Sequence, residues 1–94
     1  MRVKVKTFAN LKEIIGTQEL SIDLGPGATL EDLLNTLMQK YGEPFERQIK
    51  DQMTRKIVPF LLLVNEKAYR SLTDLGTPLQ EGDVITIMIP FDGG

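Results

Sequence analysis

The sequence contains neither cysteine nor histidine, and these two absences limit the chemistry that its side chains can perform. Without cysteine there is no disulfide, no thiolate ligand for a metal and no thiol nucleophile. Without histidine, the usual general base and the commonest metal ligand are both missing. We therefore expect a protein with little means for side-chain catalysis and with no bound cofactor of its own.

Long hydrophobic runs and an excess of basic charge are also missing. The longest apolar stretch runs from Ile57 to Val64 and is interrupted by Pro59, so it is far too short to span a bilayer. Residues 1–6 alternate between apolar and basic side chains and lack the continuous apolar core of a secretion signal. The net charge of -2 argues against a nucleic-acid partner, because phosphate binding needs a clustered basic surface. These features predict a single cytoplasmic domain of 94 residues.

Alternating apolar and polar residues predict the strands. Val3 and Val5 share one face of a half-buried strand, and Ile85 and Ile87 do the same near the other end of the chain. The segment 60–64 is apolar on both faces. Together the patterns predict strands at residues 2–8, 20–24, 60–64, 68–72 and 84–89.

The clearest helix begins after Thr29. Its hydroxyl can cap the first turn, and Asp32 three residues later approximates a capping box. Gly42 is a natural end for this helix. The apolar stripe on its inner face is formed by Leu30, Leu33, Leu34, Leu37, Met38 and Tyr41. A short helical turn is also predicted over residues 8–15, and residues 43–58 are expected to hold either a second, irregular helix or a mobile loop.

These elements predict an α+β fold. One long helix covers only one face of a sheet, so the other face is left for solvent or for a partner. The first and last strands are expected to lie side by side and parallel at the centre of the sheet, because the long connection with the helix supplies the crossover. This layout is the ubiquitin-like β-grasp, a mixed four- to five-stranded sheet with one main helix packed on one face.

Two short motifs carry less information. Gly25-x-Gly27 begins like a dinucleotide-binding loop, but Leu30 stands where the third glycine would be, so a plain turn is the better interpretation. A group of basic residues between the helix and the third strand is either part of a solvated face or a docking patch for an acidic partner; its members are Arg47, Lys50, Arg55 and Lys56.

An exposed apolar patch is predicted on the open face of the sheet. If Leu61 and Leu63 point to the helix, Leu62 points away from it. Met88 on a neighbouring strand also points outward, and Phe91 follows it in the tail. Leu62, Met88 and Phe91 are therefore expected to form either an interface or a surface that residues 43–58 fold over and bury.

The sequence ends in Gly93-Gly94, directly after the last predicted strand. Because glycine has no Cβ, such a tip is slender enough to enter a narrow slot in another protein and to present its terminal carboxyl as a substrate. A frayed terminus or a cloning scar would look the same.

Several blocks of the sequence, taken in their order, resemble the sulfur-carrier family, and most of all its branch of molybdopterin synthase small subunits. The blocks are Val3-x-Val5-x-x-Phe8-Ala9-x-Leu11-x-Glu13, Thr29-Leu30-x-x-Leu33-Leu34, Leu63-Val64-Asn65, Thr77-Pro78-Leu79-x-x-Gly82-Asp83 and Pro90-x-x-Gly93-Gly94. The resemblance runs from end to end, weakest at residues 43–58. It implies one β-grasp domain, 1–94, with a flexible C-terminal tail, 90–94.

The resemblance implies a chemistry in which Gly94 is the reactive residue. A ubiquitin-activating-type adenylating enzyme uses ATP to adenylate the Gly94 carboxylate, and a sulfur donor converts the adenylate to a thiocarboxylate. The carrier then docks onto the large subunit of molybdopterin synthase and donates the sulfur to a pterin precursor of the molybdenum cofactor. No nucleic acid or membrane is implied. The residues expected to contact partners are Leu62, Met88, Pro90, Phe91, Asp92 and Gly93.

Three residues depart from the family tail, which often has two prolines and small residues before the glycines: Ile89, Phe91 and Asp92. These differences bear on the identity of the acceptor more than on the activation of Gly94. The alternatives are a ubiquitin-like protein modifier or a carrier for tRNA thiolation or another pathway. A rival of a different class is a β-grasp interaction module whose tail is never activated.

Overall fold

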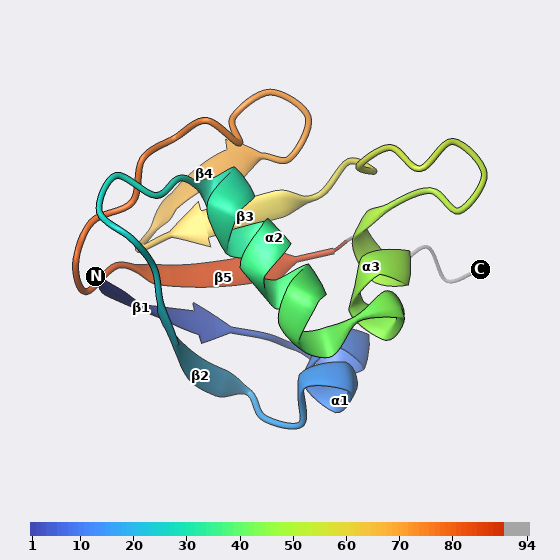
Figure 1. The fold of residues 1–94 in the computed structure, drawn as a ribbon, viewed down its shortest axis with the longest axis horizontal. Coiled ribbons are helices and arrows are strands. Elements are labelled where there is room, and N and C mark those ends of the chain that lie inside the picture. The colour runs from blue at the N-terminus through green and yellow to red at the C-terminus, as the bar shows by residue number, and fades with distance from the viewer. Residues whose placement is uncertain (90–94) are drawn as a thin grey trace.

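The computed structural model describes residues 1–89 and shows three helices and five strands in that part of the chain (Figure 1). In chain order the elements are β1 (Arg2–Lys6), α1 (Ala9–Ile15), β2 (Glu19–Asp23), α2 (Leu30–Tyr41), α3 (Glu43–Ile49), β3 (Leu61–Val64), β4 (Lys67–Arg70) and β5 (Val84–Met88). The strands form one mixed sheet in the order β2-β1-β5-β3-β4.

Strands β1 and β5 lie side by side at the centre of the sheet and run parallel, with Val5 opposite Ile85. The other neighbouring strands pair antiparallel. Helix α2 lies across one face of this sheet (Figure 1). The predicted α+β class and the ubiquitin-like β-grasp layout are therefore confirmed.

Helix α2 forms where the sequence predicts it because its first turn is capped from both directions. The backbone N–H of Asp32 donates to the Thr29 hydroxyl at 3.3 Å, and the backbone N–H of Thr29 donates to the Asp32 carboxylate at 2.9 Å. Gly42 ends the helix with a φ of 70°, which favours glycine. Each fully buried leucine of the helix contributes roughly 1.5–3 kcal/mol to stability; these residues are Leu30, Leu33, Leu34 and Leu37.

The segment between α2 and β3 combines both of the structures expected for it. Helix α3 fills the first half and buries Phe45 and Ile49 in the core. A closed loop fills the second half, where Lys50 and Ile57 pair across a short bridge. Met53 lies in this loop and is 93% exposed. The segment therefore adds to the core at one end of the sheet and leaves the outer face of the sheet open.

The basic residues of this segment are partly neutralised by their neighbours. Arg47 pairs with Glu43 at 2.6 Å, and Arg55 pairs with Glu46 at 2.7 Å. The pairs lie at the surface, where each contributes little to stability. This arrangement favours the interpretation of a solvated face.

The predicted orientation of β3 is wrong. Leu62 has an exposed fraction of 0% and lies opposite Ile87 on the inner face of the sheet, whereas Leu61 is 42% exposed. Asn65 joins the end of β3 to the start of β5, because its backbone N–H donates to the Val84 carbonyl at 2.7 Å. Its side-chain oxygen also accepts from the Val84 N–H at 3.1 Å. Since β3 is apolar on both faces, such pairing contacts decide which face each leucine takes.

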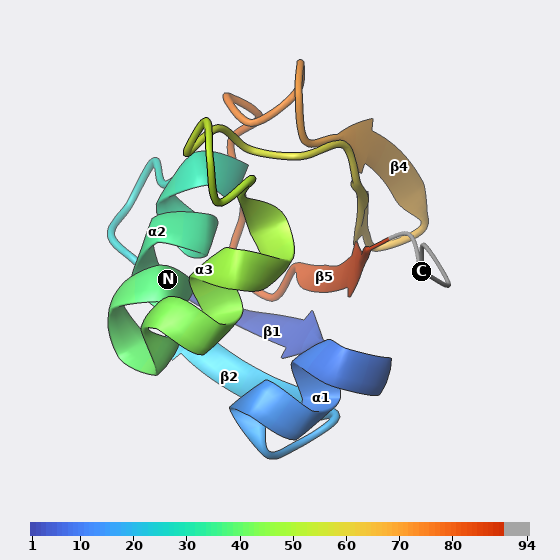
Figure 2. The ribbon, with the colours of Figure 1, turned by 90° about the vertical axis from the view of Figure 1, so that its right-hand side faces the viewer.

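Helices α1 and α3 lie together at the end of the sheet where β1 and β5 finish (Figures 1 and 2). Helix α1 follows β1 closely, and β5 runs parallel to β1, so both helices lie near the last residues of β5. No helix within residues 1–89 is long and apolar enough to cross a membrane.

Candidate functional site

The described residues contain no group of side chains arranged for metal-dependent chemistry. Within residues 1–89, no three histidine, cysteine, aspartate or glutamate residues are placed to hold a metal ion. Every buried side-chain nitrogen or oxygen in that range has a hydrogen-bond partner, so none of them is left over for a ligand. The features that remain for function lie on the surface.

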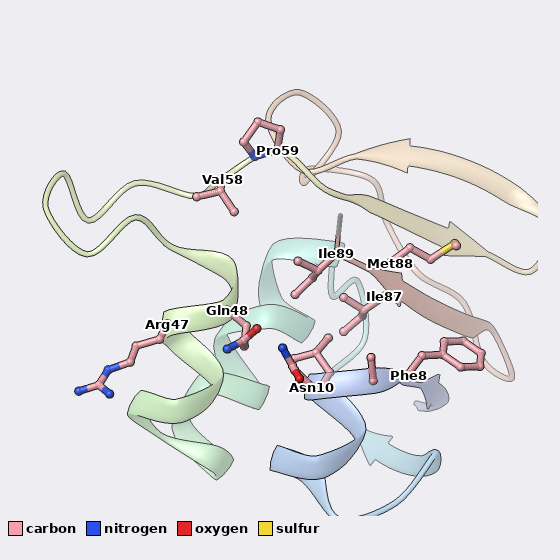
Figure 3. Close-up of a pocket in the computed structure, with 11 residues that line it drawn as sticks. Phe8, Asn10, Arg47, Gln48, Val58, Pro59, Ile87, Met88 and Ile89 are labelled. Atoms are coloured by element: carbon pink, nitrogen blue, oxygen red, sulfur yellow. The ribbon is translucent and has the colours of Figure 1, made fainter. Parts of the chain in front are cut away.

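Three exposed apolar side chains lie around the end of β5, and we call them the docking patch: Phe8, Leu61 and Met88. Their exposed fractions are 48%, 42% and 46%. Leu61 and Met88 are directly opposite each other in the antiparallel β3–β5 pair, which places them side by side on the outer face of the sheet. Phe8 precedes α1 in an extended conformation and borders the same hollow as Met88 (Figure 3). Clustered apolar residues at a surface are typical of an interface.

The docking patch has basic residues on both sides. Lys6 lies opposite Thr86 in the β1–β5 pair, and Arg70 lies opposite Leu61 in the β3–β4 pair. Residues directly opposite in a sheet share a face, so both cations border the patch on the outer face. A partner with an apolar centre and an acidic rim would complement this arrangement.

The ion pair of Arg2 and Asp23 lies at the other end of the sheet. Their side chains approach to 2.9 Å, and the hydrogen bond and charge of the guanidinium lower the pKa of Asp23. Both groups are exposed and lie near the start of β1, whereas the docking patch lies where the parallel strand β5 ends. This pair therefore joins β1 to β2 at the opposite end of the sheet and is not part of the docking patch.

A groove beside the end of β5 is lined by side chains of α1 and α3 (Figure 3). Its cavity volume is about 560 Å³. Ile87 and Ile89 point to one side of the strand and Met88 to the other (Figure 3). All three line the groove, as does Phe8, so the groove adjoins the docking patch. The walls of the groove also include Asn10, Gln48, Val58 and Pro59.

The structure describes two of the predicted partner-contact residues. Met88 is exposed, as predicted, whereas Leu62 is fully buried and cannot belong to an exposed patch. The remaining predicted site residues lie outside the described range; they are Pro90, Phe91, Asp92, Gly93 and the predicted reactive residue Gly94.

Phe8 and Leu61 belong to the docking patch, but the sequence did not lead us to predict them as partner-contact residues. Phe8 could have been found, because it has the same parity along the strand as the outward-facing Lys4 and Lys6. Leu61 had no such signal, since apolar neighbours surround it in the chain. Its side of the sheet follows from the pairing of β3 with β5.

The comparisons with known proteins place this arrangement in a family context. The ThiS family model matches residues 5–94. The chain is 27% identical to small archaeal modifier protein 3 of Haloferax volcanii over 94 residues, covering 100% of both chains. It is 29% identical to the molybdopterin synthase sulfur carrier subunit of Chlamydomonas reinhardtii over 94 residues, again covering 100% of both.

Solved structures share the fold. The solution structure of small archaeal modifier protein 1 from Methanosarcina acetivorans has a TM-score of 0.74 at 33% identity, and the match covers 99% of this chain and 96% of that one. The crystal structure of the same modifier from Haloferax volcanii has a TM-score of 0.82 at 24% identity, with both chains covered at 100%. A chain in the protein–protein complex of subunits 1 and 2 of molybdopterin-converting factor from Helicobacter pylori has a TM-score of 0.59 at 23% identity, with 100% of both chains covered.

Proposed function

The chain belongs to the ThiS family of sulfur carriers and ubiquitin-like modifiers, and on this basis we propose that it carries sulfur as a thiocarboxylate on Gly94. A carboxylate is a poor electrophile until it gains a good leaving group. In the proposed reaction, a Gly94 carboxylate oxygen attacks the α-phosphate of ATP and pyrophosphate leaves. A sulfide-level nucleophile from a sulfur donor then attacks the carbonyl carbon, AMP leaves, and one oxygen has been replaced by sulfur.

In the proposed reaction the chain is the substrate, and its partners hold and position it. With neither cysteine nor histidine, it offers few groups for acid–base or covalent catalysis, so an adenylating enzyme would supply the catalytic side chains. Two glycines at the tip leave no side chain to obstruct a narrow active site. Because the activation consumes ATP, we propose that it takes place in the cytoplasm.

The observation that carries the proposal is the position of the docking patch. Phe8, Leu61 and Met88 are exposed at the end of β5, the strand from which the chain continues toward Gly94. A partner that covers these three side chains is therefore held next to the start of the tail. Large apolar side chains at the centre of an interface commonly supply most of its binding energy.

For the acceptor, we propose the large subunit of molybdopterin synthase and a pterin precursor of the molybdenum cofactor. The similarity to the sulfur carrier subunit of Chlamydomonas reinhardtii over the whole chain supports this assignment. The similarity to a Haloferax volcanii modifier protein, also over the whole chain, supports a second candidate, attachment of Gly94 to lysines of other proteins.

Intact-protein mass spectrometry tests the proposal. The protein is incubated with an adenylating enzyme of the same organism, ATP and a sulfur source. Replacement of one oxygen by sulfur at Gly94 supports the carrier. Lysine conjugates without sulfur transfer support the modifier, and the absence of any ATP–pyrophosphate exchange would leave a β-grasp interaction module.

A variant of the docking patch tests the role of the surface separately. Leu61→Arg should lower kcat/KM for activation by roughly tenfold or more, since loss of an interface anchor costs about 1–2 kcal/mol or more. Gln39→Arg is the matched control, because it places the same charge on an exposed residue of α2. Equal activation of the two variants would rule out the docking patch as the contact surface.

A further inference from the structure

All the sulfur in the amino-acid sequence belongs to methionine. The sequence has four methionines and no cysteine, so before sulfur is loaded onto the C-terminus the thioethers are the only sulfur atoms that an oxidant can attack. A thioether is oxidised to a sulfoxide, a polar and chiral group, and exposed side chains react first. The exposure of each methionine therefore predicts the order in which the four side chains oxidise.

The four methionines differ widely in exposure. Met1 and Met38 are partly buried and pack against the core. Met53 lies in the loop after α3 and is 93% exposed, whereas Met88 on β5 is 46% exposed. Oxidation is therefore expected first at Met53, next at Met88 and last at the two partly buried side chains.

Met88 is the one methionine of the four that belongs to the docking patch. It lies directly opposite Leu61 in the β3–β5 pair and borders the same hollow as Phe8. Its side chain extends away from the strand and carries the sulfur near its free end (Figure 3). A partner that covers the docking patch therefore covers this sulfur, and an oxidant reaches it while the partner is absent.

We propose that Met88 is a redox-sensitive residue and that its oxidation by hydrogen peroxide switches off docking of the partner. The sulfur attacks one peroxide oxygen, the O–O bond breaks and an S–O bond forms. The proton of the transferred hydroxyl passes to the departing hydroxide, which leaves as water, so the sulfur is oxidised by two electrons and the peroxide is reduced. The inference rests on the proposed function, because it concerns the surface through which the partner docks.

The sulfoxide makes one position of the docking patch polar. Its oxygen is hydrated in the free protein, and the apolar centre of a partner offers no donor to replace that water. Binding should therefore weaken roughly tenfold. The fold should be retained, because the Met88 side chain lies on the outer face while its neighbour Ile87, which is 1% exposed, stays in the core.

The modification is reversible in chemical terms. A methionine sulfoxide reductase returns two electrons to the sulfur from a dithiol, which becomes a disulfide, and the oxygen leaves as water. The chain has no cysteine, so this dithiol must come from another protein. Oxidation and reduction of Met88 would thus make docking responsive to the peroxide concentration.

Met53 is an internal control for the same chemistry. The Asp51 carboxylate accepts a hydrogen bond from its backbone N–H at 2.8 Å, and its side chain is not part of the docking patch. Its sulfur is the more exposed of the two and should oxidise faster than that of Met88. Oxidation at Met53 should nevertheless leave docking unchanged.

Peptide mapping tests the site. The protein is treated with hydrogen peroxide for graded times, and the peroxide is removed with catalase before any partner is added. Mass spectrometry then follows the gain of one oxygen at each methionine. Met88 should oxidise more slowly than Met53 and faster than Met38, and equal rates at Met88 and Met38 would overturn the proposal.

Activation by the adenylating enzyme, measured as ATP–pyrophosphate exchange, tests the consequence. After oxidation, kcat/KM of the parent should fall roughly tenfold through a higher KM, and Met53→Leu should lose as much. Met88→Leu keeps an apolar side chain without sulfur, so its kcat/KM should be the same before and after treatment. Untreated Met88→Gln, which carries a polar side chain of similar length, should reproduce the loss.

Three results would refute the switch while leaving the proposed function intact. These are equal activation of oxidised and untreated parent, an equal loss on treatment in Met88→Leu and in the parent, and unfolding of the oxidised parent at the assay temperature, measured by circular dichroism. If the untreated parent is not activated at all, the proposed function fails, and the switch fails with it.

Discussion

Leu61 and Leu62 are adjacent residues on β3 that face opposite sides of the sheet. Alanine substitutions at the two positions should therefore damage different properties of the protein. Leu62 has an exposed fraction of 0% and pairs across the sheet with Ile87 and Tyr69 on the inner face. Leu61 is 42% exposed and lies beside Met88. We expect Leu62→Ala to damage stability and Leu61→Ala to damage partner binding.

The size of each effect follows from burial. Leu62→Ala removes three buried carbons, worth about 0.8 kcal/mol each, and leaves a cavity that the surrounding core only partly closes. The free energy of unfolding should fall by roughly 3–5 kcal/mol, a large fraction of the 5–15 kcal/mol typical of a folded domain. Leu61→Ala loses about half of the transfer contribution and creates no closed cavity, so a loss of about 1 kcal/mol is expected.

Urea unfolding followed by circular dichroism measures both variants against the parent. The unfolding midpoint should shift strongly for Leu62→Ala and slightly for Leu61→Ala, with unchanged dependence on denaturant concentration. The rate of ATP–pyrophosphate exchange with the adenylating enzyme should fall for Leu61→Ala, measured at a temperature where both variants are folded. Equal destabilisation by the two substitutions, or a larger loss for Leu61→Ala, would refute the register assigned to β3.

Three further predictions concern the helix cap, the loop after α3 and the end of the chain. Thr29→Ala removes the cap of α2 and should lower stability by about 1 kcal/mol, or roughly 4–8 °C in Tm, whereas Thr29→Ser should retain it; identical melting of both variants would contradict the role of the cap. The backbone N–H groups of Thr54 and Met53 donate to the Asp51 carboxylate and hold its pKa below the ordinary value, so the contribution of this turn is present above the pKa of a free aspartate and is lost as the pH falls through the lowered pKa. A carboxyl-carbon titration should give Asp51 a midpoint below that of aspartate in a flexible peptide, and a midpoint at or above it would disprove the turn. Deletion of Gly94 should abolish thiocarboxylate formation and leave Tm nearly unchanged, because one terminal glycine buries little area; a large fall in Tm would show that the residue is structural.

Much of the fold could be predicted because its signals are local. The cap at Thr29 and the apolar stripe of α2 lie within one stretch of sequence, and the structure confirms both. The central position of β1 and β5 followed from the order of elements and from the need for a crossover between parallel strands. The capping residue and the spacing of apolar side chains act through the backbone of their own segment, so they are visible without knowledge of the remaining chain.

The docking patch needed the tertiary structure. β3 carries leucines on both faces, so the sequence alone could not decide between Leu61 and Leu62. The hydrogen bonds between Asn65 and Val84, residues far apart in the sequence, help to decide it by aligning β3 with β5. The predicted patch was therefore on the correct sheet face at Met88 and on the wrong side of the strand at Leu62.

The sequence by itself determined the class of the fold, the main helix and the absence of cysteine and histidine chemistry, because composition and periodicity are properties of single segments. Only the tertiary structure decided which apolar side chains surround the end of β5 and that a groove lined by side chains of α1 and α3 opens there. Both features arise where strands and helices from distant parts of the chain meet, and their positions depend on pairing register and packing rather than on the pattern within any one segment.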